Sequence, residues 1–72
     1  MSFWDSYEVV SVIKKTPASE IRIAKVRKGE MSGIDIRAFL ENLPTKKGIV
    51  INDNHLAEFS RIINEITKEE LL

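Results

Sequence analysis

The chain has 72 residues, no cysteine, one histidine and a formal net charge of zero at pH 7. Without cysteine it has neither a disulfide framework nor a thiolate metal site, and one histidine cannot form a zinc site unaided. No segment reaches the roughly 20 apolar residues of a membrane-spanning helix. We therefore expect no membrane partner and an intracellular protein, cytoplasmic in a bacterium or virus and nuclear in a eukaryote.

The small size and the uneven charge both point to partners. A chain this short forms a single domain, 1–72, and buries only about 60% of the surface that its unfolded form exposes, so we predict a homodimer. Residues 14–47 include nine basic and four acidic residues, whereas residues 1–13 and 48–72 are both net acidic. This asymmetry predicts one surface for an anionic partner.

The first predicted elements are a tail and a strand. Residues 1–6 form the tail, and residues 7–15, rich in β-branched side chains, form the strand. Proline and small polar residues at 16–19 end this strand in a turn. The tail includes Phe3 and Trp4, which we expect to pack against the body of the domain, with base stacking by Trp4 as the alternative.

Residues 20–28 form the second predicted strand. Apolar and charged residues alternate at first, but the alternation slips at Ala24–Lys25 before Val26 turns inward and Arg27 outward. A β-bulge accommodates such a slip and bends the strand. The pattern therefore predicts a curved sheet with a concave side.

Two further strands complete the predicted sheet, which spans residues 7–51. After a connection at 29–33, residues 34–40 alternate, with Ile34, Ile36, Ala38 and Leu40 facing the core and Asp35, Arg37 and Phe39 facing the other way. Residues 41–47 are expected to form a loop, and residues 48–51 a short buried strand.

A helix is predicted over residues 53–70. Asn52, Asp53 and Asn54 are suitable N-cap residues, and an apolar stripe follows at helical spacing. We expect this stripe to cover the sheet and to form a dimer interface with Leu56, Phe59, Ile63 and Ile66. The predicted fold is α+β: a four-stranded curved antiparallel sheet followed by one C-terminal helix, dimerising through the helix.

Groups for catalysis are sparse. His55 is predicted to be a solvated or capping side chain, and the serines lack the G-x-S-x-G context of a nucleophile. Asp35 shares a strand face with Arg37, so we expect a structural ion pair there. The sequence predicts no enzyme, no catalytic residue, no metal and no cofactor.

The basic residues gather around the predicted sheet. A charge run is often only a solvated face, but Phe39 alternates with Arg37 on the non-core face. An exposed ring beside cations suits single strands, whose bases stack and whose phosphates bind cations. The alternative is that Phe39 packs under a loop or a dimer partner. The predicted DNA-binding residues are Lys14, Lys15, Arg22, Lys25, Arg27, Lys28, Arg37, Phe39, Lys46 and Lys47.

Over residues 7–66 the chain resembles the single-stranded-DNA-binding domain of the transcriptional coactivator, or positive cofactor four, family. The resemblance rests on the order and spacing of Lys28-Gly29, Ile34-Asp35-Ile36-Arg37 with Phe39, Lys46 through Asn52, and Leu56 near the helix start. It implies a dimer with paired helices whose sheet grooves hold single strands or melted duplex with little sequence preference.

The resemblance also implies roles for individual residues. Backbone contacts would come from Lys25, Arg27, Lys28, Arg37, Lys46 and Lys47, and base stacking from Phe39. Arg27 stands where many members have an aromatic residue, and Leu40 stands where some have tryptophan. The connection after Gly29 is also about one residue longer than in the family. These departures predict weaker stacking on bases. Since the serine- and lysine-rich extension of the eukaryotic coactivators is missing, a minimal bacterial or viral member is expected.

The predicted function is therefore single-stranded DNA binding by a homodimer acting in transcription or DNA metabolism. No residue identifies a reader of the RNA 2′-hydroxyl, so DNA and RNA are not distinguished. The alternative is a dimeric protein-interaction module whose basic sheet face contacts an acidic partner, such as a transcription protein.

Overall fold

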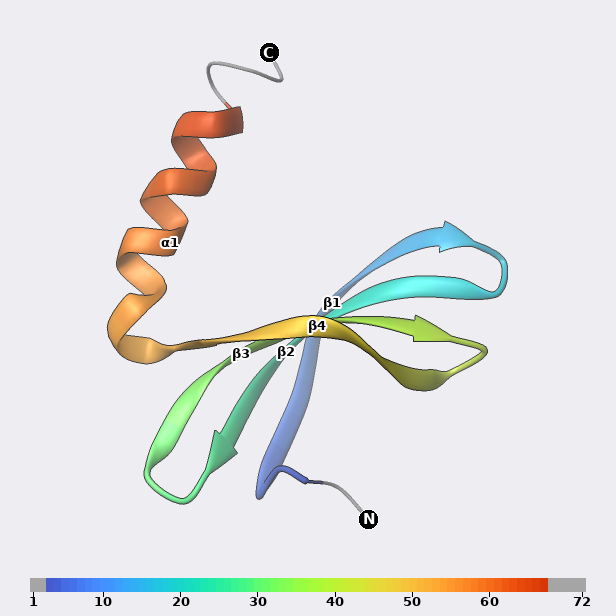
Figure 1. Cartoon of the computed structure of the whole chain (residues 1–72), viewed down its shortest axis with the longest axis horizontal. Coiled ribbons are helices and arrows are strands. Elements are labelled where there is room, and N and C mark those ends of the chain that lie inside the picture. Colours follow the sequence, from blue (N-terminus) through green and yellow to red (C-terminus); the bar gives the residue numbers. More distant parts are fainter. Residues whose placement is uncertain (1–2, 68–72) are drawn as a thin grey trace.

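The chain forms one open sheet of four antiparallel strands followed by a single helix (Figure 1). A computed structural model describes residues 3–67. The strands lie in sequence order within the sheet, and the elements are β1 Ser6–Thr16, β2 Ser19–Lys28, β3 Met31–Leu40, β4 Leu43–Asn52 and α1 Asp53–Ile66. This arrangement confirms the predicted α+β fold of four strands and one C-terminal helix.

The strands are longer, and two connections shorter, than the sequence predicts. The connection at 29–33 contracts to Gly29 and Glu30, and the loop at 41–47 contracts to Glu41 and Asn42. Gly29, Glu41 and Asn42 all have positive φ, at 61°, 51° and 69°. Positive φ suits tight hairpin turns whose twist matches that of the strands. Glu-Asn is not among the common sequences of such turns, and the loop was predicted because residues 41–47 include asparagine, proline and two lysines.

The predicted bulge at Ala24–Lys25 is wrong. Strands β2 and β3 pair residue for residue from Ser19 opposite Leu40 to Lys28 opposite Met31. A register shift lies instead in β1, between Val9 and Ser11. Successive side chains of β2 therefore alternate between the two faces without a break. The apolar-charged pattern of the sequence slips at Ala24–Lys25 because both faces of this strand include apolar residues.

The unbroken register divides the central strands into two faces. We call groove face the side with Glu20, Arg22, Ala24, Val26 and Lys28 of β2 and Gly33, Asp35, Arg37 and Phe39 of β3. The helix face includes Ile21, Ile23, Lys25 and Arg27 of β2 and Ile34, Ile36, Ala38 and Leu40 of β3. Lys25 and Arg27 thus lie on the side opposite Arg22 and Arg37.

Burial is greater on the groove face, the reverse of the prediction. Among the described residues, the buried hydrophobic side chains are Ala24, Val26 and Phe39. On the helix face Ile34, Ile36 and Ala38 are half-buried and Leu40 is 52% exposed. The reason is that α1 contacts only β3 and β4, so most of the helix face has no second layer. Strand β4, predicted to be buried, is mostly exposed.

Helix α1 leaves the edge of the sheet and runs away from it (Figure 1). Asn52 is the N-cap residue but makes no side-chain cap hydrogen bond. Residues 68–70 of the predicted helix lie outside the described residues. Within the described residues, no helix is long and apolar enough to cross a membrane. Leu56, Phe59 and Ile63 line an open hollow against Ile34 of β3.

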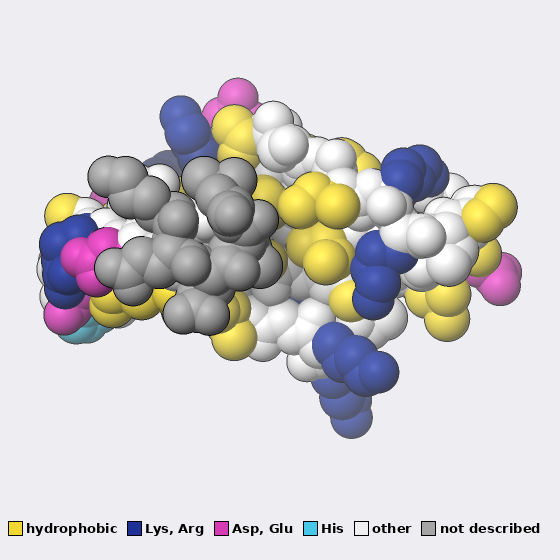
Figure 2. All heavy atoms as spheres, turned by 90° about the horizontal axis from the view of Figure 1, so that it is seen from above, with side chains coloured by type: hydrophobic (Ala, Val, Ile, Leu, Met, Phe, Trp, Pro, Cys, Tyr) yellow, Lys and Arg dark blue, Asp and Glu magenta, His cyan; other side chains and the backbone are white. Residues whose placement is uncertain are grey.

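The chain exposes more surface than a monomer of its size. Its accessible surface is 5785 Å², whereas a folded monomer of this mass exposes about 4,500 Å². Large hydrophobic side chains are exposed on it, among them Ile13, Leu40, Leu43, Ile49, Ile62, Ile63 and Ile66. Figure 2 shows hydrophobic side chains at the centre of the surface seen from above, with Lys and Arg side chains near them.

Candidate nucleic-acid interface

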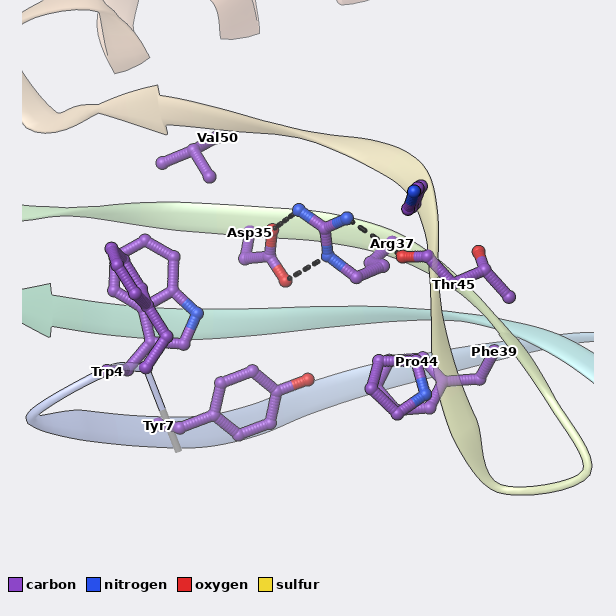
Figure 3. Close-up of a pocket in the computed structure, with 10 residues that line it drawn as sticks. Trp4, Tyr7, Asp35, Arg37, Phe39, Pro44, Thr45 and Val50 are labelled. Carbon is purple, nitrogen blue, oxygen red and sulfur yellow. Dashed lines mark hydrogen bonds and ion pairs between the residues drawn. The ribbon is translucent and has the colours of Figure 1, made fainter. Parts of the chain in front are cut away.

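A groove of about 770 Å³ lies on the groove face, between the N-terminal segment and β4 (Figure 3). It brings together residues from β1, β3, β4 and the segment before β1. They are Phe3, Trp4, Tyr7, Asp35, Arg37, Phe39, Pro44, Thr45, Lys46 and Val50. The groove therefore combines four aromatic side chains with two cations and one carboxylate.

Two hydrogen bonds fix the aromatic end of the groove. The backbone N–H of Asp5 donates to the carbonyl oxygen of Arg27 at 2.8 Å, and the N–H of Gly29 donates to the Asp5 carboxylate at 2.7 Å. The Phe3 and Trp4 rings meet edge to face, with centroids 5.0 Å apart. The N-terminal segment is thus held to the domain through Asp5, whereas Phe3, expected to pack against the domain, is 68% exposed. Trp4 lines the groove.

The centre of the groove is a bidentate ion pair between Arg37 and Asp35. Nε and one terminal nitrogen of Arg37 donate to the two carboxylate oxygens at 3.2 and 3.0 Å, and the other terminal nitrogen donates to the carbonyl oxygen of Thr45 at 3.0 Å. The Asp35 side chain is 2% exposed and that of Arg37 is 24% exposed. The predicted structural ion pair is confirmed, and it holds the guanidinium in one orientation.

A second ion pair, between Arg22 and Glu20, lies on the neighbouring part of the groove face. Nε of Arg22 donates to the Glu20 carboxylate, whose other oxygen lies 2.9 Å from Nζ of Lys14. Arg22 also donates to the side-chain oxygen of Asn42 at 3.1 Å. Its guanidinium lies 4.1 Å above the centroid of the Phe39 ring. The hydrogen bonds from Arg22 and then Lys14 hold the pKa of Glu20 below its usual value.

The two pairs repeat one sequence pattern, acid-isoleucine-arginine, at Glu20-Ile21-Arg22 and Asp35-Ile36-Arg37. Side chains two apart on a strand share a face, so each arginine meets the acid that precedes it. The antiparallel register then places Arg22 directly opposite Arg37. Like charges across a strand pair repel, and here a carboxylate compensates each of them. This repeat is the sequence signal from which both ion pairs could have been predicted.

Tyr7, Pro44 and Thr45 belong to the groove but were not predicted. Tyr7 lies opposite Val26, and burial, followed by the nearby Asp35 carboxylate, raises the pKa of its hydroxyl. Thr45 sits where the pairing of β3 and β4 is irregular, and its hydroxyl donates to the carbonyl oxygen of Ala38 at 2.7 Å. No sequence pattern marks that irregularity, because it falls in the segment expected to be a loop.

The structure gathers about half of the predicted DNA-binding residues on one face. Lys14, Arg22, Lys28, Arg37 and Phe39 lie on the groove face, and Lys46 lines the groove. Lys25 and Arg27 lie on the helix face, which corrects the expectation that all basic residues of β2 project together. Lys15 and Lys47 do not line the groove.

Phe39 is not the exposed ring that base stacking needs. Its side chain is 7% exposed, because Arg22 covers the ring and Pro44 stands opposite in β4. The alternative expectation placed Phe39 under a loop or a dimer partner; the ring is buried, but Arg22 of β2 and Pro44 of β4 cover it. Rings at the other end of the groove are more accessible, with Phe3 68% and Tyr7 37% exposed.

Comparison with models of protein families, with curated proteins and with solved structures finds no match to this chain.

Proposed function

We propose that this chain binds single-stranded DNA with little sequence preference, as a homodimer acting in transcription or DNA metabolism. The observation that supports this most is the groove, in which accessible rings and cations line one continuous surface. Single strands bind such surfaces through phosphates on cations and bases on flat side chains. The family resemblance of the sequence supports the same function.

The charges of the groove face favour a polyanion despite the neutral chain. Five cations, Lys14, Arg22, Lys28, Arg37 and Lys46, accompany two carboxylates there, a net charge of +3. Lys14, Arg22 and Arg37 pair with those carboxylates. Lys28 and Lys46 form no ion pair within the described residues, and Lys28 lies 4.7 Å above the Phe3 ring. We therefore assign Lys28 and Lys46 as the main phosphate ligands.

Fluorescence anisotropy with oligo-dT and with a duplex of equal length tests this function. We expect preference for the single strand, and a slope of log K against log salt of about −2 if about three phosphates are neutralised. Lys46→Glu should weaken binding, whereas Arg27→Glu, a charge reversal on the opposite face, should leave it nearly unchanged. Equal affinity for both nucleic acids, or a larger effect of Arg27→Glu, would contradict the proposal.

The dimer part of the proposal rests on the uncovered apolar surface. The chain exposes roughly 1,300 Å² more than a monomer of its mass, which is within the range that one partner buries in a stable dimer. Ile63 and Ile66 of α1 are exposed, and Leu56 and Phe59 are half-buried. These residues were predicted as the dimer interface and continue the apolar helix face.

Sedimentation equilibrium tests the dimer. We expect a dimer for the wild-type chain and a monomer for Ile63→Glu, because a buried charge without a partner is costly. Ala57→Glu, on the opposite side of the helix, is the matched control and should remain dimeric. A wild-type monomer at all concentrations would rule out this part of the proposal.

Lys25 and Arg27 favour the alternative of a protein-interaction module, because they stand beside isoleucines on the helix face. Such a surface suits an acidic partner with apolar side chains. In a pull-down with an acidic amphipathic peptide, this alternative predicts that Arg27→Glu abolishes binding and Lys46→Glu does not.

A further inference from the structure

We infer that Arg37 is a base-stacking platform: its guanidinium lies flat in the groove and holds one nucleobase of the bound strand on its open face. The inference rests on the proposed function of the groove. It assigns Arg37 a contact with a base, where the resemblance implies a contact with the phosphate backbone.

The edges of the guanidinium are largely engaged within the protein. Of its five N–H donors, two are bound by Asp35 and one by the carbonyl oxygen of Thr45. The Asp35 side chain is 2% exposed, so solvent hardly competes for the pair. A phosphate that binds the edge of Arg37 that includes Nε must displace Asp35 and leave a buried carboxylate without its partner, which is costly. One N–H donor on each terminal nitrogen is not used by these bonds.

One face of the guanidinium rests on the sheet backbone at Gly48. A Cβ atom on Gly48 would lie 2.8 Å from Cζ of Arg37, which is closer than real contacts allow. Glycine at 48 therefore leaves room for the guanidinium against the backbone of β4. In Figure 3 the guanidinium is seen with its flat side toward the viewer, and its three hydrogen bonds run to Asp35 and Thr45. The Arg37 side chain lines the groove and is 24% exposed.

A fixed, flat cation of this kind suits a nucleobase. Bases stack on guanidinium planes as they do on aromatic rings, and such stacking tolerates any sequence because every base has a π-face. Tyr7 and Pro44, which also line the groove, provide further walls for the same base. The neighbouring Arg22 does not provide such a stacking surface, because its guanidinium lies over the Phe39 ring.

The test compares Arg37→Lys with the wild type on two strands. One is an oligo-dT of about 15 nucleotides, near the site size of single-strand binders, and the other is the same backbone with abasic sites throughout. Lysine keeps the positive charge and can still reach Asp35, but it has no plane. We expect Arg37→Lys to weaken oligo-dT binding roughly five- to tenfold, with an unchanged salt slope and no effect on the abasic strand.

Each other outcome contradicts the inference in a distinct way. Equal weakening on both strands, with a shallower salt slope, would identify Arg37 as a phosphate ligand. If Arg37→Lys bound oligo-dT as tightly as the wild type, Arg37 would not stack on a base, but the proposed single-strand binding would stand. If the wild-type chain bound neither strand, the proposed function would be overturned as well. Arg61→Lys on α1 is the control for the substitution itself and should bind both strands like the wild type, and circular dichroism checks that both variants fold.

Discussion

The two acid-isoleucine-arginine segments share a pattern but differ in what lies beneath the arginine. Arg22 lies over the Phe39 ring and is held by Glu20, itself paired with Lys14, and by Asn42. Arg37 lies over Gly48 and is held by an almost fully buried Asp35. One guanidinium therefore covers a ring, and the other presents its own face to the groove. The residue on the adjacent strand, and not the local pattern, decides which role each arginine can take.

The largest expected difference between the two pairs is in stability. Asp35→Ala leaves the Arg37 charge without a partner in a mostly buried position, and breaking such a pair typically costs about 3–5 kcal/mol. Glu20→Ala removes an acid whose side chain is 12% exposed, against 2% for Asp35, and should lower the free energy of unfolding less. Urea denaturation of both variants at pH 7 measures the contrast. Equal losses would mean that burial does not distinguish the pairs.

Gly48→Ala should have the next largest effect. The added methyl group would lie 2.8 Å from both Cζ of Arg37 and the carbonyl oxygen of Ile36, so the side chain and the backbone must move apart. Overpacking of this kind costs about 1–3 kcal/mol. Thermal unfolding measures the loss, and oligo-dT affinity should fall with it because the guanidinium is displaced.

Gly29→Ala provides the comparison for the glycine substitution. Gly29 has a φ of 61°, but no atom lies within 4 Å of the position that an added methyl group would take, so the cost is conformational alone. We expect a loss of about 1 kcal/mol with unchanged oligo-dT affinity. If Gly29→Ala lowered the affinity as much as Gly48→Ala, the effect at Gly48 would reflect general destabilisation.

Arg22→Gln should show a smaller effect on stability. The substitution removes the cation over the Phe39 ring, a contact that contributes about 0.5–1 kcal/mol at exposed sites. It also removes the ion pair with Glu20, which Lys14 still compensates. It also uncovers the ring, so binding of a hydrophobic dye that reports aromatic exposure should increase. Unchanged dye binding would show that Pro44 alone is enough to cover Phe39.

The smallest expected effect is a pH dependence of the Glu20 network. The pKa of Glu20 is lowered in the folded state, so its stabilising effect is present above the unfolded value of 4.5 and is lost as the pH falls through the lower folded value. Glu20→Gln removes this contribution. Between pH 6 and about pH 3, the melting temperature of the variant should therefore fall less steeply than that of the wild type. Parallel curves would contradict the assignment.

The order of elements could be predicted from the sequence, but the faces of the sheet could not. β-branched segments, turn residues and the helical stripe identify four strands and one helix. The faces depend on which side is covered, and that is decided by the N-terminal segment and by the short contact of α1 with β3 and β4. Ala24 and Val26 interrupt the simple alternation of apolar and charged residues because the groove face also needs apolar residues.

The site was predictable where one strand contributes it and not where several do. The pairing of Asp35 with Arg37 follows from spacing on a single strand. The burial of Phe39 depends on Arg22 and Pro44 in neighbouring strands, and the position of Tyr7 depends on the register shift in β1. Such cross-strand relations follow from the register, which the alternation of one strand does not determine.

Binding of a single strand on the groove face, with Arg37 at its centre, is tested most directly by amide chemical shifts recorded during titration with oligo-dT. Each residue reports separately in this measurement, so the two faces of the sheet are distinguished. We predict that the largest changes occur at Tyr7, Arg37, Thr45 and Lys46, with small changes at Lys25 and Arg27. Changes concentrated on the face of Lys25 and Arg27, with the groove residues unaffected, would contradict binding in the groove.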